Sequence, residues 1–335
     1  MRRRAFIAGL LVAAAAGRAQ AQRTEKVYRI ARIYPAQPVA EAIKAKNTQG
    51  SLAWFFFEEL RRLGFVEGQN LVYDRYSAEG RTDQYSELAR DVVRSNPDLI
   101  FTDQLAAVLA LKAATTTIPI VAYINDPVAA GIVPSLARPG GNITGVSSNA
   151  GPEISGKYVQ LLREAVPGLS SVGLLATRAM WQTAEGALML EAARQVQISL
   201  TGPPLDYPLD EAEFRRVLAA MAQAGAQALI VAQNPQVYQN LRLIVELAEN
   251  GRLPAIFPYR ESVELGGLMA FGPDLVEGIR HIVDQIAKIL RGANPGDIPF
   301  YQPTKFFLVI NLKTAKALGI EISASLVARA DEVIE

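Results

Sequence analysis

Continuous runs of apolar residues alternate with amphipathic stretches along the chain from residue 27 onward. The apolar runs include VYRIARIY (27–34), DLIFTD (98–103) and IPIVAYI (118–124). Unbroken runs of this length are typical of parallel strands that are buried on both faces of a sheet. Stretches with helical spacing lie between them, such as SLAWFFFEELRRLG (51–64), which ends at a glycine. This pattern predicts a succession of β-α-β units.

The series of units restarts beyond residue 147, after the segment ITGVSS. Further strands are predicted at SVGLLAT (171–177), ALIVAQ (228–233), PAIFP (254–258), GLMAFGP (267–273) and FFLVIN (306–311). A chain of 335 residues exceeds what one hydrophobic core usually holds, and right-handed crossovers place helices on both faces of a parallel sheet. The pattern therefore predicts an α/β protein with two doubly wound, Rossmann-like lobes.

The first 21 residues have the character of a secretory signal peptide. MRRR is a basic start, AFIAGLLVAAAA is an apolar stretch too short to span a bilayer comfortably, and Ala19-Gln20-Ala21 fits a cleavage site. Arg3-Arg4-Ala5-Phe6-Ile7 also resembles a twin-arginine signal, which directs the export of a folded protein. The sequence therefore predicts cleavage after Ala21 and a mature protein outside the cytoplasmic membrane, with an uncleaved anchor or an amphipathic helix as the alternatives.

Charge and cysteine content exclude several classes of function. Removing residues 1–21 takes away four arginines and no acidic residue, so the formal net charge changes from +1 to −3. A faintly acidic chain has no electrostatic footprint for nucleic acid or for an anionic membrane. The chain contains no cysteine, which excludes disulfides, a lipid anchor on cysteine, thiol catalysis and thiolate metal sites.

Recognisable catalytic and cofactor motifs are missing from the sequence. His281 is the only histidine, so no second histidine and no cysteine can complete a metal site or a catalytic triad with it. The chain has no G-x-S-x-G, P-loop or G-x-G-x-x-G pattern, and Gly140-Gly141 precedes a strand rather than a helix. We therefore predict a binding protein rather than an enzyme, with no cofactor and no metal.

Polar and aromatic residues follow the predicted strands at the positions where open α/β sheets bind ligands. In the first lobe these are Tyr34, Asp103, Gln104, Asn125 and Asp126, and Ser148 lies where the chain passes to the second lobe. In the second lobe they are Arg178, Trp181, Gln233, Asn234, Tyr259, Arg260 and Glu261. The first lobe thus offers hydrogen-bond acceptors, and the second lobe offers arginines and aromatic rings. This combination suits a small polar ligand that carries a carboxylate. Each residue singly also fits a role as a helix cap or loop residue.

The stretch NDPVAAGIVPSLARPGGNITG (125–145) follows the third apolar run. It predicts a short helix with Pro127 in its first turn and Asp126 as its N-cap. Asp126 can cap this helix, contact the ligand, or do both with its two oxygens. Pro139-Gly140-Gly141-Asn142 is predicted to be a structural turn, in which glycine supplies a positive φ.

Several longer motifs resemble those of one protein family. SLARPGGNITG, GGLMAFGPDL, QPTKFFLVINLKTAKALGI and the ending ARADEVIE are similar to segments of ABC-transporter substrate-binding proteins, in the group with tryptophan- and tyrosine-binding members. LGFVEGQNLVYDRYSAEGR and TTIPIVAYINDPVAAGIV fit the same group, and the resemblance covers Val27 to Glu335. It implies the periplasmic-binding-protein type I fold, with two lobes joined by three crossing segments near residues 147, 272 and 303.

The crossings implied by the resemblance divide the chain into three parts. These are the signal peptide (1–21), a first lobe of residues 27–147 plus 273–303, and a second lobe of residues 148–272 plus 304–335. The resemblance also implies a periplasmic solute receptor that captures its ligand by hinge closure and docks on the membrane permease of an ABC importer. We expect a monomer and no nucleic-acid partner.

The chain departs from the family pattern at two of the candidate positions. Relatives commonly have a small residue and Thr-Pro where this chain has Asp103-Gln104. They commonly have an Asn-Pro pair where this chain has the stretch from Thr177 to Trp181. The resemblance therefore carries over for the geometry of the lobes and leaves the identity of the ligand open.

Other functions fit the same fold. A ligand sensor would dock its closed form on a membrane receptor or kinase, and the sequence does not separate it from a transport receptor. An exported enzyme would need a catalytic constellation that the sequence lacks. A regulator similar to the sugar repressors would need a helix-turn-helix where the signal peptide lies.

Overall fold

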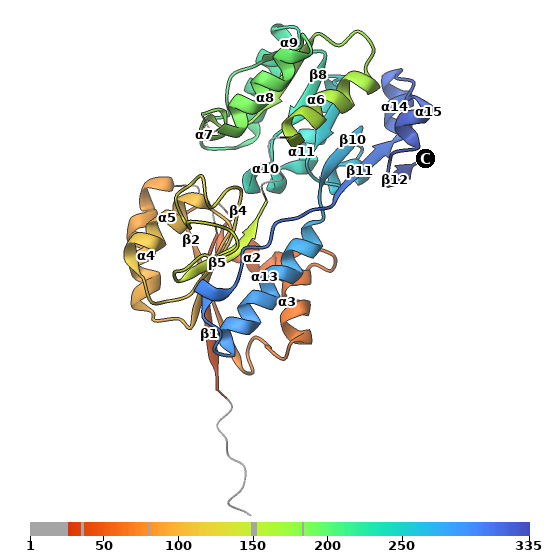
Figure 1. Ribbon diagram of the computed structural model, residues 1–335. Helices are drawn as coiled ribbons and strands as arrows, with labels where there is room; N and C mark the ends of the chain where they lie inside the picture. Colours follow the sequence, from red (N-terminus) through yellow and green to blue (C-terminus); the bar gives the residue numbers. More distant parts are fainter. Residues whose placement is uncertain (1–25, 35–36, 80, 149–152, 183) are drawn as a thin grey trace, which may run out of the picture.

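The computed structural model describes residues 26–34, 37–79, 81–148, 153–182 and 184–335. These residues form two α/β lobes, each built around its own sheet (Figure 1). We call them lobe 1, which holds the first five strands, and lobe 2, which holds the other seven. The two lobes confirm the predicted fold class, and the predicted signal peptide (1–21) lies outside the described residues.

The sheet of lobe 1 is parallel, with the strand order β2-β1-β3-β4-β5. Its strands are β1 (Tyr28–Tyr34), β2 (Leu71–Ser77), β3 (Leu99–Thr102), β4 (Ile120–Ile124) and β5 (Ile143–Ser147). Strands β3 and β5 are buried along their whole length, as expected for apolar runs covered on both faces. The order changes direction between β1 and β3, and such a switch point is where open α/β sheets usually bind ligands.

Helices cover both faces of the sheet of lobe 1. They are α2 (Val39–Lys46), α3 (Leu52–Arg62), α4 (Tyr85–Arg94), α5 (Leu105–Ala114) and α13 (Leu275–Leu290), with the short 3₁₀ helices η1 (Thr82–Gln84) and η2 (Pro295–Asp297). Ile100 packs into the apolar core with residues of α4 and α5, while Phe101 packs into the core with residues of α3 and α13. Neighbouring strand residues enter different cores because successive side chains point to opposite faces.

Helix α13 comes late in the sequence but packs on lobe 1 beside α3 (Figure 1). Asp274 caps its N-terminus, since its carboxylate accepts hydrogen bonds from the backbone amides of Val276 and Glu277. Ser51 caps α3 in the same way through the amide of Trp54. Local capping signals thus set where both helices on this face begin.

The sheet of lobe 2 has the order β12-β11-β10-β9-β8-β6-β7. Its strands are β6 (Ser171–Leu175), β7 (Ser199–Thr201), β8 (Ala228–Val231), β9 (Ala255–Phe257), β10 (Met269–Pro273), β11 (Phe306–Asn311) and β12 (Glu332–Ile334). Strands β6 to β10 are parallel, whereas β11 runs antiparallel to β10. The order of β6 to β10 repeats that of lobe 1, so lobe 2 has its own switch point between β6 and β8.

Helices also cover both faces of the sheet of lobe 2. They are α6 (Glu153–Ala165), α7 (Arg178–Trp181), α8 (Ala184–Gln195), α9 (Glu211–Gln223), α10 (Pro235–Gln239), α11 (Leu241–Asn250), α12 (Glu261–Glu264), α14 (Leu312–Leu318) and α15 (Ala324–Val327). Leu174 and Leu175 of β6 pack into two separate apolar cores. Among the residues that the structure describes, no helix is long and apolar enough to cross a membrane.

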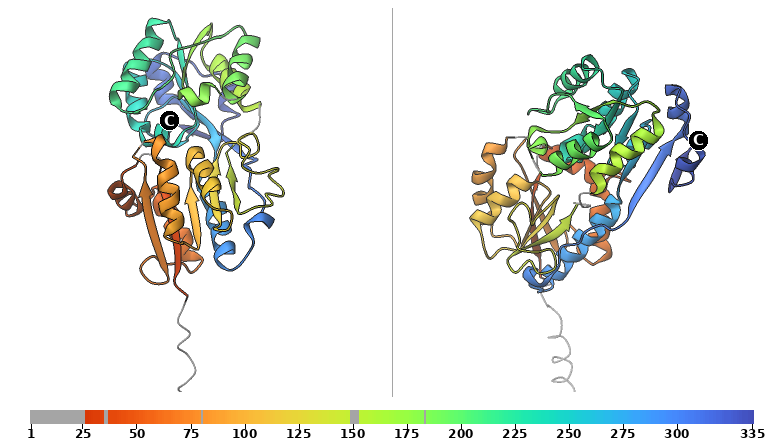
Figure 2. Two further views of the ribbon diagram at one scale, coloured as in Figure 1. Left: turned by 90° about the vertical axis from the view of Figure 1, so that its left-hand side faces the viewer. Right: turned by 45° about the horizontal axis from the view of Figure 1, so that its top comes forward.

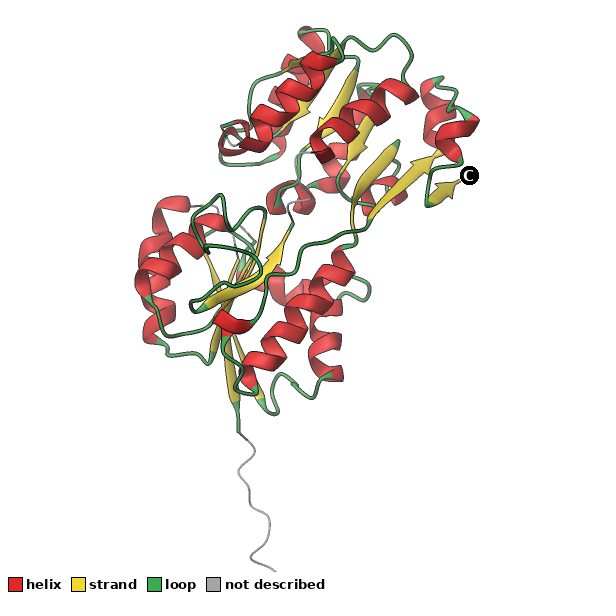
Figure 3. Ribbon diagram, viewed as in Figure 1, coloured by secondary structure: helices red, strands yellow, loops and turns green. Residues whose placement is uncertain are grey.

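Two connections between the lobes lie within the described residues. One runs from β10 into α13, and the other runs from η2 to β11 (Figures 2 and 3). On the second connection, the backbone of Tyr301 hydrogen-bonds to that of Gly145 and Ser147 in lobe 1 before the chain enters lobe 2. The predicted crossing near residue 147 leads into residues 149–152, which lie outside the described residues.

The structure corrects the helix predicted after Asp126. Residues 127–131 form a turn instead. Asp126 Oδ1 still accepts hydrogen bonds from the backbone amides of Val128 and Ala129, at 3.1 and 2.9 Å. Gly131 has a φ of +67°, which takes the chain out of the right-handed helical region after one turn.

Candidate functional site

The carboxyl ends of the parallel strands in the two lobes face each other (Figures 1 and 2). We call the carboxyl ends of β1, β3 and β4 in lobe 1 and of β6, β8 and β9 in lobe 2, together with the described residues that follow them, the facing edges. Both switch points lie at these edges. The facing edges are therefore where the folding of each lobe places its candidate ligand contacts.

A shielded ion pair lies at the switch point of lobe 1. Arg32 is in β1, Asp103 directly follows β3, and Arg32 Nη2 donates to Asp103 Oδ2 at 2.9 Å. Only 15% of the Arg32 side chain and 21% of the Asp103 side chain are exposed. The guanidinium carbon of Arg32 also lies 4.4 Å from the ring centres of Tyr34 and Phe101. Cation–π attraction therefore adds to the ion pair in holding Arg32.

Burial and charge act in opposite directions on Arg32. Burial lowers its pKa, but Asp103 and the nearby tyrosines together raise that pKa above its ordinary value, so Arg32 keeps its charge. Arg32 Nε and Asp103 Oδ1 are shielded from solvent and have no partner at hydrogen-bonding geometry among the described residues, although the hydroxyl of Tyr73 lies near enough to Arg32 to help raise its pKa. Leaving such a polar group without a partner costs about 1–3 kcal/mol. The pair thus has unused hydrogen-bonding capacity.

A second charged cluster adjoins Arg32 on β2. Arg75 donates from Nη1 and Nη2 to the two carboxylate oxygens of Glu67, at 2.7 and 3.0 Å. Lys46, at the end of α2, pairs with the same carboxylate. Burial acts to raise the pKa of Glu67, but the hydrogen bonds from Arg75 and Lys46 outweigh burial and lower it. Two cations share one carboxylate, so this cluster of three side chains carries a net positive charge.

Side chains of the two lobes approach each other at the facing edges in two places. Burial raises the pKa of the Tyr123 hydroxyl in β4. The side-chain amide of Gln233 in lobe 2 lies near enough to this hydroxyl to lower the pKa in part. The amide of Gln104 interacts with the hydroxyls of Tyr85 in lobe 1 and Tyr207 in lobe 2. Gln104 and Gln233, both candidates from the sequence, thus lie where the two lobes approach each other.

Asn234 and Tyr259 form one corner of the facing edge of lobe 2. Asn234 Oδ1 caps α10 by accepting from the backbone amides of Gln236 and Val237, at 2.8 and 3.3 Å. The hydroxyl of Tyr259, which is buried, accepts from the backbone amide of Asn234 at 3.0 Å and donates to its carbonyl at 3.1 Å. Both residues therefore have a structural role, whether or not they also contact a ligand.

The two arginines predicted to bind a carboxylate already have carboxylate partners within lobe 2. Arg178 Nε and Nη2 donate to Asp206 at 2.7 and 2.6 Å. Arg260 Nη2 lies 2.6 Å from Glu332 Oε2. A ligand carboxylate would have to compete with these pairs, and the role of both arginines as ligand contacts stays a prediction.

Glu261 lies next to Arg260, in the first turn of α12, and is half-buried. Burial raises its pKa, and the neighbouring charge of Glu264 adds to that shift. The hydroxyl of Tyr238 lies 3.5 Å from Glu261 Oε1. Glu261 therefore lies near the facing edge as a hydrogen-bond acceptor, and its raised pKa means that its carboxylate form is less favoured than that of an exposed glutamate.

The remaining candidates differ in exposure. Tyr34 and Ser148 are buried, Asp126 and Trp181 are half-buried, and Asn125 is exposed. Trp181 Nε1 is shielded and has no hydrogen-bond partner in the described part of the chain. Trp181 packs against the same core of lobe 2 as Phe271. These five residues stay predicted ligand contacts.

His281 lies beside the connection between η2 and β11 rather than at the facing edges. Its ring stacks on that of Tyr301, with ring centres 3.4 Å apart, and Tyr301 Oη donates to Glu277 at 2.9 Å. Within the described ranges, no group of three or more histidine, aspartate or glutamate side chains is arranged to hold a metal ion.

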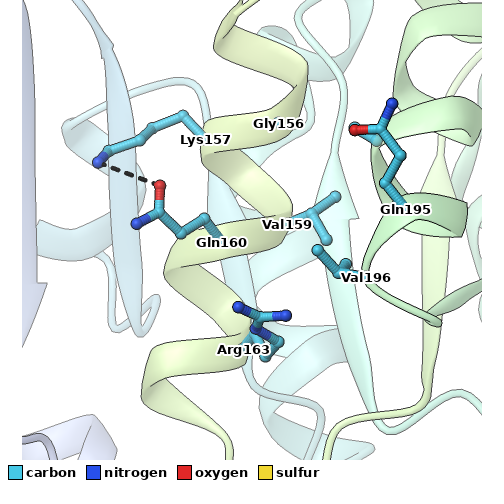
Figure 4. Close-up of a pocket in the computed structure, with 8 residues that line it drawn as sticks. Gly156, Lys157, Val159, Gln160, Arg163, Gln195 and Val196 are labelled. Atoms are coloured by element: carbon cyan, nitrogen blue, oxygen red, sulfur yellow. Dashed lines mark hydrogen bonds between the residues drawn. The ribbon is translucent and has the colours of Figure 1, made fainter.

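Two open grooves on lobe 2 lie elsewhere. One, with a volume of about 540 Å³, runs between α6 and α8 and is lined by Lys157, Gln160, Arg163 and Gln195 among others (Figure 4). The other, of about 400 Å³, lies between α11 and α14. Neither groove is lined by a residue predicted from the sequence to contact the ligand.

Arg32, Tyr123 and Tyr207 are not among the residues predicted from the sequence. Arg32 gives a usable signal, because a charge inside the apolar strand VYRIARIY requires a charged partner in the fold. Tyr123 and Tyr207 give none, since a tyrosine in a strand or loop commonly serves packing alone. Their place between the lobes depends on how the two sheets are oriented.

Comparison with known proteins finds one matching family. The family described as ABC transporter substrate binding protein matches residues 52–334. A curated relative, the tyrosine-binding protein of Clostridioides difficile (strain R20291), is 24% identical over 271 residues, which cover 79% of this chain and 76% of that protein.

Solved structures share the two-lobe fold. A conserved domain protein from Vibrio cholerae O1 biovar El Tor has a TM-score of 0.77 and 26% identity, and the match covers 92% of this chain and all of that one. A domain from Streptococcus pneumoniae in complex with L-Trp has a TM-score of 0.76 and 22% identity, with 92% of this chain covered and all of that one. The likeness extends across both lobes.

Proposed function

The chain belongs to the family of ABC transporter substrate-binding proteins, and we propose that it is the exported solute receptor of an ABC importer. Members of this family bind a small molecule for a transporter and are not enzymes. The proposed ligand is small, polar and carboxylate-bearing, of the amino-acid or aromatic class. It binds between the lobes, at the facing edges, and closure of the lobes captures it.

One observation carries this proposal. Polar and aromatic side chains gather at the switch points of both sheets, and the two edges are near enough for Tyr123 of lobe 1 to interact with Gln233 of lobe 2. A ligand held there touches both lobes at once, which is the condition for coupling binding to closure. Asp103, the partner of Arg32, acts on Tyr123 through its charge, so the pair of Arg32 and Asp103 belongs to this part of lobe 1.

The ligand class is supported by relatives and by the residues of the edges. The curated relative is a tyrosine-binding protein and one solved relative is in complex with L-Trp. Both ligands join a carboxylate to a ring, which suits arginine and aromatic side chains. The proposed contacts are Tyr34, Asp103, Gln104, Asn125, Asp126, Ser148, Arg178, Trp181, Gln233, Asn234, Tyr259, Arg260 and Glu261, together with Arg32.

Closure is proposed as a rigid-body movement of two parts of the chain. These parts are residues 27–147 plus 273–303 and residues 148–272 plus 304–335. A ligand shifts the open-to-closed equilibrium by the difference in its affinity for the two forms. The closed form then docks on the permease of the importer.

Export follows from the predicted signal peptide in residues 1–21. The mature chain would act as a monomer in the periplasm, where its ligand and the permease are both within reach. Its faintly acidic charge keeps it from binding nucleic acid or an anionic membrane without specificity.

Thermal unfolding of residues 22–335 against a panel of amino acids, aromatic acids, small peptides and sugars tests the function. A ligand at about 100 times its dissociation constant adds ~2.7 kcal/mol to the free energy of unfolding, which raises Tm by several degrees. We expect a shift with amino acids or aromatic acids. A shift with sugars alone, or none with any compound after refolding has removed ligand carried through purification, contradicts the proposed ligand class.

A further inference from the structure

The ion pair of lobe 1 is neutral as a whole, yet each partner keeps an unused polar atom. Arg32 Nη2 donates to Asp103 Oδ2, while Arg32 Nε and Asp103 Oδ1 are shielded and have no partner at hydrogen-bonding geometry within the part of the chain that the structure describes, the hydroxyl of Tyr73 being the polar group near Arg32. A buried ion pair is favourable only where its remaining protons and lone pairs find partners as well. The pair therefore presents a cationic donor and an anionic acceptor side by side.

Asp103 lies on the side of lobe 1 that lobe 2 approaches. After the larger effect of burial, its charge raises the pKa of both Tyr85 and Tyr123, so it stands close to their hydroxyls. Tyr123 interacts with Gln233 of lobe 2, and Gln104, which directly follows Asp103, interacts with Tyr207 of lobe 2. The charged pair and the boundary between the lobes thus belong to one region.

Arg32 is fixed in place on this region. Its guanidinium lies over the rings of Tyr34 and Phe101, and the pair joins β1 to the end of β3 across the switch point. A cation that is held by two rings and a carboxylate loses little freedom when it binds a ligand. By contrast, Arg178 and Arg260 are more than half exposed and occupied by carboxylates of lobe 2.

We propose that this pair makes the receptor select a zwitterion, in which the ligand ammonium binds Asp103 and the ligand carboxylate binds Arg32. The inference rests on the function proposed above and narrows it. A ligand with a carboxylate alone is attracted by Arg32 but repelled by Asp103 beside it. A ligand with an ammonium alone is attracted by Asp103 but repelled by Arg32. In a shielded place such like-charge repulsion is strong. An α-amino acid matches both charges at once.

Isothermal titration with two matched series of compounds tests the inference on the wild-type chain. One series is L-tyrosine, 3-(4-hydroxyphenyl)propionate, which lacks the ammonium, and tyramine, which lacks the carboxylate. The other is L-tryptophan, 3-indolepropionate and tryptamine. We expect the amino acid of at least one series to bind at least about tenfold more tightly than both of its analogues.

The variant Asp103→Asn isolates the role of the carboxylate. It keeps an acceptor for Arg32 but removes the charge, so amino-acid binding weakens by about tenfold or more, while the deaminated acid binds as well as before or better. Asp98→Asn is the matched control, because Asp98 precedes β3 at the opposite edge of the same sheet and pairs with Lys26. This control leaves the ratio between amino acid and analogue unchanged.

The outcomes separate the inference from the function on which it rests. Equal binding of an amino acid and its deaminated analogue to the wild-type chain overturns selection for a zwitterion while the receptor function stands. Binding of a sugar or peptide, with none of the six compounds bound, also overturns selection for a zwitterion. The absence of binding to any class of small molecule overturns the proposed function itself. Because the wild-type series needs no variant, the test holds even if Asp103→Asn fails to fold.

Discussion

The hydroxyl of Tyr123 interacts with the amide of Gln233, so a side chain of β4 in lobe 1 meets one that follows β8 in lobe 2. Tyr123 is anchored within lobe 1, since its ring lies against Gly278 of α13, where an added Cβ would be 3.2 Å from it. Gln233 is fixed in lobe 2 by its place just before Asn234, the cap of α10. The contact thus joins two rigid parts of the molecule and depends on their separation.

Removing this contact is expected to weaken ligand binding without unfolding either lobe. A polar contact between neutral groups contributes at most what a hydrogen bond does, about 0.5–1.5 kcal/mol, so Gln233→Ala and Tyr123→Phe should each raise Kd by up to about tenfold. Titration with the bound amino acid measures the change. The double variant should lose no more than the worse single one, and fully additive losses would show that the two residues act separately.

Asp126 offers a test that separates capping from ligand contact. Its Oδ1 accepts from the backbone amides of Val128 and Ala129, so Asp126→Ala should destabilise the chain by about 1 kcal/mol. Asp126→Asn retains an acceptor and should stay near wild-type stability. Denaturant unfolding measures both variants. If Asp126→Asn unfolds as easily as Asp126→Ala, the cap depends on charge; if its stability holds but binding weakens, the carboxylate contacts the ligand.

Gly145 should tolerate no side chain. A Cβ at this position in β5 would lie 1.8 Å from the carbonyl oxygen of Ala122 on the neighbouring strand. Gly145→Ala should therefore destabilise lobe 1 by about 3 kcal/mol or more, because the strand pairing has to shift. Gly141→Ala is the control, since nothing lies within 4 Å of the Cβ it would add. Equal Tm values for the two variants would contradict the register of β4 and β5.

His281 should make stability depend on pH. Burial lowers its pKa below the ordinary value, although Glu277 and Asp284 act to raise it. The unfolded chain then binds the proton more tightly, so the free energy of unfolding falls as pH drops from about 6.5 to the folded pKa, and the loss is complete below that value. Urea unfolding of the wild type and His281→Gln from about pH 5 to pH 8 measures this. The variant should have the shallower slope over this range, and identical slopes would contradict the prediction.

Most of the fold could be predicted because it rests on local patterns. Continuous apolar runs gave the strands that became β1, β3 and β4 to within two residues at their ends, and the amphipathic stretch at 51–64 became α3. Short elements were not predicted, among them α2, β7, α12, α15 and β12, because three to eight residues hold too little periodicity. The turn at 127–131 was predicted as a helix because Asp126 and Pro127 carry the same signals at a turn as at a helix start.

The candidate site could be predicted only in part. The rule that ligands bind beyond strand ends led to Gln104 and Gln233, which the structure places where the lobes approach. It did not lead to Arg32, which lies within β1 and turns toward Asp103 across the sheet. Nor could it show that Arg260 forms an ion pair with Glu332, a residue far along the chain. Such pairings depend on how distant segments pack.

The central claim is that a ligand closes the lobes, and a distance between them tests it most directly. The chain has no cysteine, so cysteines introduced at Arg90 in α4 and Ala219 in α9, both exposed, can carry spin labels at unique positions. These helices lie in different lobes, on the side away from the connections (Figure 1). Labels at Leu190 in α8 and Ala219 report within lobe 2 alone and serve as the control. We predict that a saturating amino-acid ligand shortens the distance between Arg90 and Ala219 and leaves the control distance unchanged. An unchanged distance with the ligand bound would contradict capture by closure.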